Sequence, residues 1–281
     1  MRRMYIWIST ILLSLLCMIM VLPLIKVVSE SFSSKTFIEQ NAVLFWPKGF
    51  NVEAYSKVFQ NRNIFVALRN SIVVTLLGTT INLVMTATMA YPLSRTEFKF
   101  KKPILLMVTL TMIFTSPMIP SYLVIKGMGL DNSIWAVILP GMISGYNFFI
   151  MRSFFAGVPG ELIDAARIDG SGEFGILFKI VLPMSKAVMA TMILFYGVNH
   201  WNALQQPLIY LRSPKVQTLQ IKLYQILMED NTSMVDVGVL QIAPTTIKMA
   251  TIVISTIPIL IVYPFLQKHF AAGAMLGSVK E

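Results

Sequence analysis

Acidic residues gather in one short stretch of the sequence, ELIDAARIDG at residues 161–170. Glu161, Asp164 and Asp169, together with Glu173 just beyond, are four of only thirteen acidic residues among 281. Carboxylates at this density could contact a protein partner, or they could form the charged face of a helical hairpin lying on a membrane surface. Composition alone leaves both interpretations open.

A second set of polar residues lies farther along the chain, inside an apolar stretch. On a helix its members share one broad face: Tyr196, Asn199, His200, Asn202 and Gln206, with Trp201 in the same stretch. Amides hydrogen-bond to hydroxyl groups and aromatic rings stack on sugar rings, which suits a path for carbohydrate. The same groups can also hold membrane helices together, and the sequence leaves both roles open.

Groups that could energise transport or catalyse a reaction are missing from the apolar stretches. No Asp or Glu falls within the six spans predicted below, so none offers a carboxylate to bind a coupling proton or sodium ion. The chain contains no GxxxxGK[ST] loop, and two His with one Cys predict no metal site. We therefore expect a passive pathway driven from outside the chain, with no cofactor of its own and no enzymatic activity.

The elements that position these residues are predicted to be membrane helices. The chain is 56% hydrophobic and only 13% charged, with a mean hydropathy of +0.70, which leaves too little polar surface for a soluble domain. We predict an all-α polytopic membrane protein, with residues 1–281 as a single transmembrane domain. Its six expected spans lie at about 5–28, 68–93, 104–125, 133–151, 187–210 and 249–267.

Basic residues set the expected orientation of these spans. Arg2 and Arg3 precede the first span, and four more basic residues crowd into the loop at 94–103. Short loops rich in Lys and Arg stay in the cytoplasm, so both termini and the loop at 152–186 are predicted to be cytoplasmic. The formal net charge of +10 follows from this topology and predicts no nucleic-acid partner.

Local signals predict two short helices within the loop at 152–186. Pro159 suits a helix start, Glu161 would lie in the first turn near the positive helix end, and Gly170 is suited to cap the far end. A second short helix follows and is expected to stop at Pro183.

The stretch DAARIDG, followed after nine residues by IVLP at 180–183, resembles the EAA loop of binding-protein-dependent ABC importer permeases. In that family the loop forms a coupling helix that sits in a groove of the cytoplasmic ATPase subunit. Asp164 stands where the family usually has Glu. The resemblance implies a coupling role for Glu161, Asp164, Ala165, Ala166, Asp169, Gly170 and Pro183.

Three further stretches, FWPKGFNVEAYSKVF, GVNHWNALQQPLIYL and FAAGAMLGSVKE, are similar to carbohydrate-uptake permeases of the type of the smaller permease of the maltose importer. This resemblance implies a bacterial cell-membrane protein that works with a second permease, two ATP-binding subunits holding ATP and magnesium, and an extracytoplasmic solute-binding protein.

The same family resemblance bears on the cargo and on the end of the chain. WN followed by PLIYLRS points to the subgroup that serves complex oligosaccharides, including pectin- and uronate-derived ones. The tail at 273–281 is expected to reach the ATPase. The alternatives from other classes are a secondary carrier and a small polytopic membrane enzyme.

Overall fold

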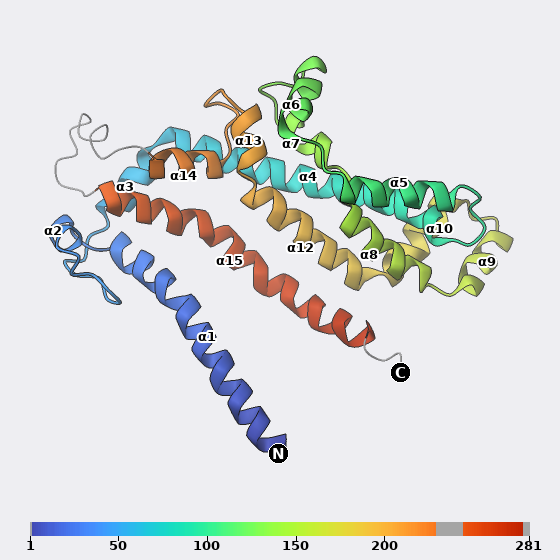
Figure 1. Cartoon of the computed structure of the whole chain (residues 1–281), viewed down its shortest axis with the longest axis horizontal. Helices are drawn as coiled ribbons and strands as arrows, with labels where there is room; N and C mark the ends of the chain where they lie inside the picture. The colour runs from blue at the N-terminus through green and yellow to red at the C-terminus, as the bar shows by residue number, and fades with distance from the viewer. Residues whose placement is uncertain (1, 229–243, 278–281) are drawn as a thin grey trace. The chain divides into compact units, whose positions relative to one another are not determined.

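A computed structural model of the chain describes residues 2–228 and 244–277. These residues form helices and connecting segments, and the described ranges contain no strand, in agreement with the predicted all-α class (Figure 1). The elements are α1 (Arg2–Ser31), α2 (Lys35–Glu39), α3 (Glu53–Gln60), α4 (Arg62–Ser94), α5 (Lys101–Ile113), α6 (Met118–Gly127), α7 (Trp135–Ile138), the 3₁₀ turn η1 (Leu139–Gly141), α8 (Gly145–Ala156), α9 (Gly160–Ile168), α10 (Glu173–Ile176), the π-helix η2 (Leu177–Val181), α11 (Leu182–Met184), α12 (Lys186–Asn202), α13 (Gln205–Tyr210), α14 (Leu219–Met228) and α15 (Pro244–Gly277).

Two helices in the described part of the chain, α1 and α4, are long and apolar enough to cross a membrane. The count rises to four if each of two bent pairs, α5 with α6 and α10–α11 with α12, forms one span. The predicted total of six is therefore not confirmed. Residues 229–243, between the last two predicted spans, and 278–281 of the predicted tail lie outside the described residues.

Three predicted spans are interrupted in the structure. The stretch expected at 133–151 is divided into α7, η1 and α8. Proline accounts for the other two interruptions. The stretch expected at 104–125 breaks after Ile113 and bends by 117°, because the residue before Pro117 is disfavoured in a helix. The stretch expected at 187–210 breaks between α12 and α13, because Pro207 has no N–H to donate to the carbonyl of Ala203. Gln206 consequently lies on α13 and not on the helix that carries Tyr196.

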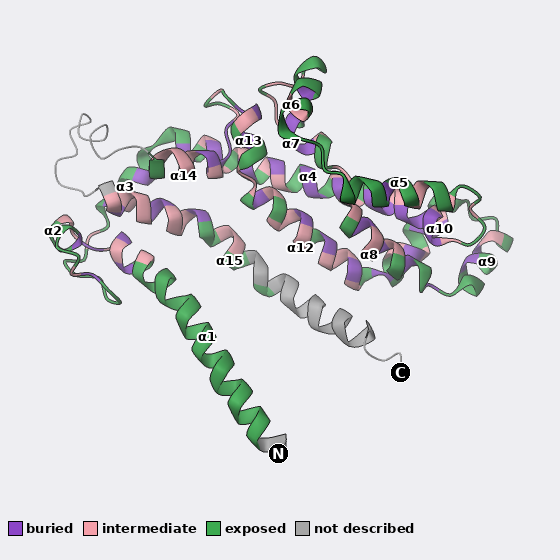
Figure 2. Cartoon of the chain, in the orientation of Figure 1, coloured by how far each residue is buried: buried purple, intermediate pink, exposed green. Residues whose placement is uncertain are grey.

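The chain divides into two compact units, and the first comprises Met1–Phe65 with Ile221–Pro258. In this unit the segment after α2 folds back onto the end of α1. The Phe32 ring stacks on Tyr55, with centroids 4.7 Å apart, and on Phe50, with centroids 5.5 Å apart. The hydroxyls of Ser31 and Tyr55 lie 2.8 Å apart. The rest of α1 is exposed within the chain, as Figure 2 shows, which is expected of a helix that faces lipid or another subunit.

The second unit comprises Val66–Gln220 with Ile259–Glu281 and contains the main hydrophobic core. This core joins α4, α8, α9, α10 and α12, with Phe148, Met151, Phe155, Ile176 and Met192 fully buried in it.

Polar contacts along α4 show how the second unit is laid out. Asn70 donates to the carbonyls of Lys215 and Gln217, whereas Tyr91 donates to Glu173. These two positions are about 30 Å apart at 1.5 Å per helical residue, which matches the thickness of a bilayer core. The 213–219 segment and α9–α10 therefore lie at opposite ends of α4.

Candidate functional site

The helix α9 begins and ends as its sequence predicts. Pro159 immediately precedes it, and Glu161 lies in its first turn. Gly170 adopts a φ of +79°, the left-handed region that glycine occupies at low cost. Its N–H donates to the carbonyl of Arg167 at 3.0 Å, and the N–H of Ser171 donates to Ala166 at 2.9 Å. This pair of bonds is a Schellman cap, so the predicted glycine cap is present.

The second short helix runs slightly farther than predicted. Pro183 lies within α11, and the chain leaves the helical path only at Ser185, with a bend of 88° before α12. The π-helical turn at Leu177–Val181 precedes Pro183, and its shifted hydrogen bonds accommodate a residue that cannot donate an N–H. The helix therefore ends one residue beyond the expected stop at Pro183.

One face of α9 is packed into the core and the other is open. Ile163 and Ala166 are 2% and 7% exposed and belong to the core cluster with Leu93 and Phe155. Outside this packed face Leu162 and Ile168 are exposed, as is Phe174 on α10. Among the residues assigned to coupling, Glu161, Asp164, Ala165, Asp169, Gly170 and Pro183 are also exposed, whereas Ala166 is not.

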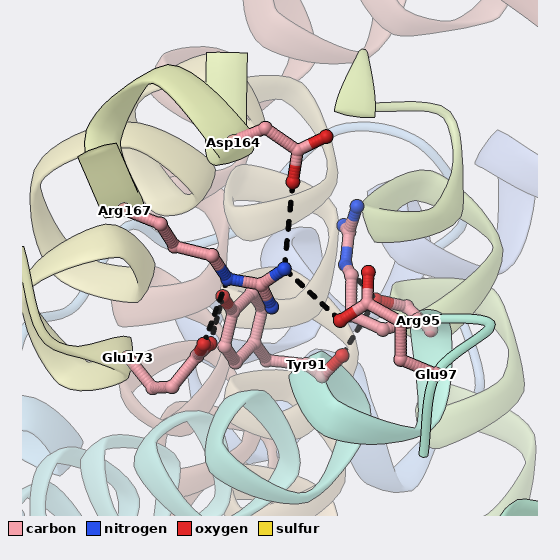
Figure 3. A network of polar contacts seen from close by, with 7 residues as sticks. Tyr91, Arg95, Glu97, Asp164, Arg167 and Glu173 are labelled. Carbon is pink, nitrogen blue, oxygen red and sulfur yellow. Dashed lines mark hydrogen bonds and ion pairs between the residues drawn. The ribbon is translucent and has the colours of Figure 1, made fainter. Parts of the chain in front are cut away.

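The Arg167 guanidinium contacts three carboxylates at and around α9 (Figure 3). Arg167 Nε donates to Glu173 Oε1 at 3.0 Å, while Nη1 lies 3.0 Å from Glu97 Oε2 and 3.4 Å from Asp164 Oδ1. The other oxygen of Glu173 accepts a 2.6 Å hydrogen bond from the Tyr91 hydroxyl. We call these five residues the Arg167 cluster. It joins α9, α10, the end of α4 and the loop that follows α4.

Two arginines fix the ends of α4 and α8 to each other. Arg152 of α8 donates from Nε to the carbonyl of Leu93 at 2.9 Å, and Arg95 donates to the carbonyl of Phe155. Each cation thus meets the negative end of the other helix, where a positive charge is stabilising. Burial lowers the pKa of Arg95.

The pKa of Arg167 moves the other way. Partial burial acts to lower it, but the hydrogen bonds to Glu97 and Glu173 outweigh burial and raise the pKa. Both guanidinium groups therefore stay charged at neutral pH.

A cavity of about 470 Å³ lies beside the Arg167 cluster. Its lining combines the charged groups of Arg95, Glu97, Arg167 and Glu173 with the apolar side chains of Phe98, Phe174 and Leu177. Residues of α4, α9 and α10 and of the loop after α4 all line this space, so the polar contacts of the cluster lie at its wall.

The second candidate region is a polar junction between α4, α12 and the turn before α8. We define it as Asn82, Thr86, Tyr196 and His200 with the nearby backbone. His200 Nε2 donates to Asn82 Oδ1 at 2.8 Å, and Asn82 donates in turn to the carbonyl of Gly141. The Tyr196 hydroxyl lies 2.8 Å from Thr86 Oγ1 and accepts from the N–H of Ser144 at 3.3 Å.

Gly78 makes room for this junction. A Cβ at this position would lie 2.5 Å from His200 Nε2, so only glycine lets the imidazole approach α4 at the present distance.

The six residues predicted to line a path divide into two groups. Tyr196 and Trp201 are buried and His200 is half-buried. Tyr196 and His200 make contacts between helices, which is one of the two roles that the sequence left open. Asn199, Asn202 and Gln206 are exposed within this chain and remain predicted path residues.

The sequence analysis missed several members of both regions. Arg167 lies three residues after Asp164 in the DAARIDG stretch, a spacing that allows an ion pair on a helix. Glu97 is the one acid in the basic loop SRTEFKFKKP. An acid alone among basic residues was a signal from which Glu97 could have been identified as a contact residue. Tyr91, Asn82 and Thr86 gave none, because their partners are 82 to 118 residues away in the sequence.

Comparison with known proteins places the chain among transport components. The model of the family "Binding-protein-dependent transport system inner membrane component" matches residues 64–275. The chain is 40% identical over 272 residues to the polygalacturonan/rhamnogalacturonan transport system permease protein YtcP of Bacillus subtilis (strain 168), covering 95% of each protein. It is 30% identical over 279 residues to the arabinooligosaccharides transport system permease protein AraQ of Halalkalibacterium halodurans, covering 98% of this chain and 96% of the relative.

A solved structure has a similar fold. A chain from the crystal structure of a bacterial ABC transporter involved in the import of the acidic polysaccharide alginate superposes with a TM-score of 0.90 at 26% identity. The match covers 95% of this chain and 97% of that one.

Proposed function

Because the chain belongs to the family of binding-protein-dependent transport system inner membrane components, we propose that it forms half of an ATP-driven import pathway and docks the ATPase through residues 161–183. The family is a transport component, so this chain is a permease subunit that works with a solute-binding protein, and the ATPase activity lies in a partner. A second permease and two ATP-binding subunits, which hold ATP and magnesium, complete the proposed complex.

The observation that supports docking at α9 is its division into two faces. The inner face is anchored by Ile163 and Ala166, so the helix has a fixed position on its own chain. The outer face carries Ile168 at 87% exposed beside the acidic side chains, and Phe174 of the following helix α10 is 72% exposed. Apolar groups rimmed by charges are typical of a surface that another protein covers. In this arrangement α9, the 94–103 loop and both termini are cytoplasmic.

The proposed cargo is an oligosaccharide that carries carboxylates. Two of the similar proteins are named for polygalacturonan/rhamnogalacturonan and for the acidic polysaccharide alginate. AraQ, named for arabinooligosaccharides, is less similar than YtcP. At the end of α4 opposite α9, the Arg212 guanidinium lies over the Tyr122 ring at 5.6 Å. Guanidinium groups bind carboxylates and aromatic rings stack on sugars, so this pair suits an acidic sugar.

Reconstitution of the whole complex tests the proposal. The purified complex is placed in liposomes with its binding protein, and uptake of an oligogalacturonate is measured with ATP and with a non-hydrolysable ATP analogue. We expect uptake with ATP only, unchanged when proton and sodium gradients are collapsed. A neutral arabino-oligosaccharide of equal length serves as the matched cargo. Uptake by this chain alone, driven by an ion gradient, would instead identify a secondary carrier.

A further inference from the structure

We infer that Arg167 and Glu173 are positioning residues that pass a displacement of α9 to the end of α4, and from there to the polar junction. This inference rests on the proposed function, because it concerns how movement at the docking helix reaches the pathway. The proposed relay is a chain of contacts that runs from α9 through Arg167, Glu173 and Tyr91 to α4.

The Glu173 carboxylate is the central link of this relay. Its two oxygens have different partners, Arg167 on α9 at 3.0 Å and the Tyr91 hydroxyl on α4 at 2.6 Å. A carboxylate that accepts from both sides is held in one orientation by charge-assisted bonds. Movement of Arg167 therefore displaces Tyr91 through the Glu173 carboxylate. The contact from Arg167 to Glu97 adds the loop after α4 to the same relay.

The cluster is poorly suited to holding the fold together. The side chains of Glu97, Asp164 and Glu173 are all more than half exposed, and ion pairs in water contribute little to stability. The apolar contacts of Ile163 and Ala166 already anchor α9. What the cluster adds is a directed polar connection from α9 to α4, through Arg167, Glu173 and Tyr91 at the wall of the 470 Å³ cavity.

The end of α4 that carries Tyr91 is held by further contacts, so a displacement of Tyr91 can move the helix. Arg152 and Arg95 tie the last turn of α4 to α8, so force on Tyr91 acts on the helix and does not simply fray its end. Thr86 and Asn82 lie on the same helix, within about 14 Å of Tyr91 at 1.5 Å per residue. Both hold α12 through Tyr196 and His200. A shift of α4 thus reaches the predicted path residues of α12.

Three variants test the relay in the reconstituted complex. Arg167→Gln removes all three ion pairs of the guanidinium, and Tyr91→Phe removes only the bond from α4 to Glu173. Arg167→Lys keeps the charge, but one ammonium cannot reproduce the fork that reaches Glu97 and Glu173 together. Lys35→Gln is the matched control, since it breaks an exposed ion pair to Glu39 on α2, outside the cluster. The measured quantity is cargo imported per ATP hydrolysed, alongside complex yield and thermal midpoint.

We expect Arg167→Gln and Tyr91→Phe each to lower the import-to-hydrolysis ratio by about 2- to 30-fold. Arg167→Lys should give an intermediate ratio. The double variant should be no worse than Arg167→Gln, because both changes break one relay. Complex yield, thermal midpoint and the Lys35→Gln ratio should match wild type.

An unchanged ratio in Arg167→Gln and Tyr91→Phe overturns the relay, and so does a loss of yield or thermal midpoint that fully accounts for the lost import. Failure of the proposed function looks different, because wild-type complex would then show no ATP-dependent uptake at all.

Discussion

The two polar regions of this chain differ in how much water surrounds them. In the Arg167 cluster the acidic side chains are 56–65% exposed and share one guanidinium. In the polar junction Asn82 and Thr86 are at most 1% exposed and each has its own partner on α12. A group in water loses little when a partner is removed, whereas a buried group left unpaired is costly. The first region can therefore exchange contacts with another protein, and the second must keep its contacts.

The largest stability effect is expected at Gly78, where the junction has no spare room. Gly78→Ala places a Cβ 2.5 Å from His200 Nε2, so the ring must move and the buried Asn82 oxygen loses its donor. The expected cost is about 1–3 kcal/mol of folding stability. Gly197→Ala on α12 is the matched control, because its Cβ would lie 3.7 Å from the nearest atom, an ordinary contact.

Alanine favours a helix equally at both glycines, so the difference between their thermal midpoints isolates the clash. Equal midpoints would show that the junction tolerates displacement, and the contrast between the two regions would not hold.

Gly170 gives the next effect, on transport more than on folding. Gly170→Val forces a branched residue into the left-handed conformation at φ +79°, at a cost of about 1–2 kcal/mol. The end of α9 should relax out of its capped shape, and import should fall by about 5- to 30-fold, the ratio that corresponds to this cost. Gly170→Asn is the control, because asparagine tolerates this conformation in the same cap. Similar import by both variants would show that the backbone conformation at Gly170 does not affect coupling to the ATPase.

The boundaries of α9 were predictable and its partners were not. Pro159 and Gly170 act within one helical turn, so local sequence sets where the helix starts and ends. The hydropathy pattern indicates apolar stretches at 104–125 and 187–210 but contains no information on the helix breaks before Pro117 and Pro207. The bond from Tyr91 to Glu173 spans 82 residues of sequence and depends on how whole helices pack. A single sequence contains no signal for such a pairing.

Tyr196→Phe should have a smaller effect than Gly78→Ala. It removes one hydroxyl that bonds Thr86 Oγ1 and the N–H of Ser144, but it adds no atoms that could clash. Hydrogen bonds between membrane helices are worth about 0.6 kcal/mol on average and about 1.7 at most. We expect a loss in that range by thermal unfolding of the purified complex. The exposed Tyr146→Phe is a suitable control, and a loss as large there would remove the distinction between buried and exposed hydroxyls.

Asn202→Leu should have the smallest effect on stability and a selective effect on import. Asn202 is exposed at the end of α12, so its replacement should change folding stability by less than about 0.5 kcal/mol. Within this chain it is not one of the junction contacts, and its amide is open to cargo or to the second permease. We expect slower import with unchanged complex yield, measured as uptake of an oligogalacturonate by the reconstituted complex. Asn199→Leu, one turn earlier on the same helix, shows how far the sensitive surface extends. Normal import with Asn202→Leu would mean that this side of α12 faces lipid, and a loss of complex yield would place it against the second permease.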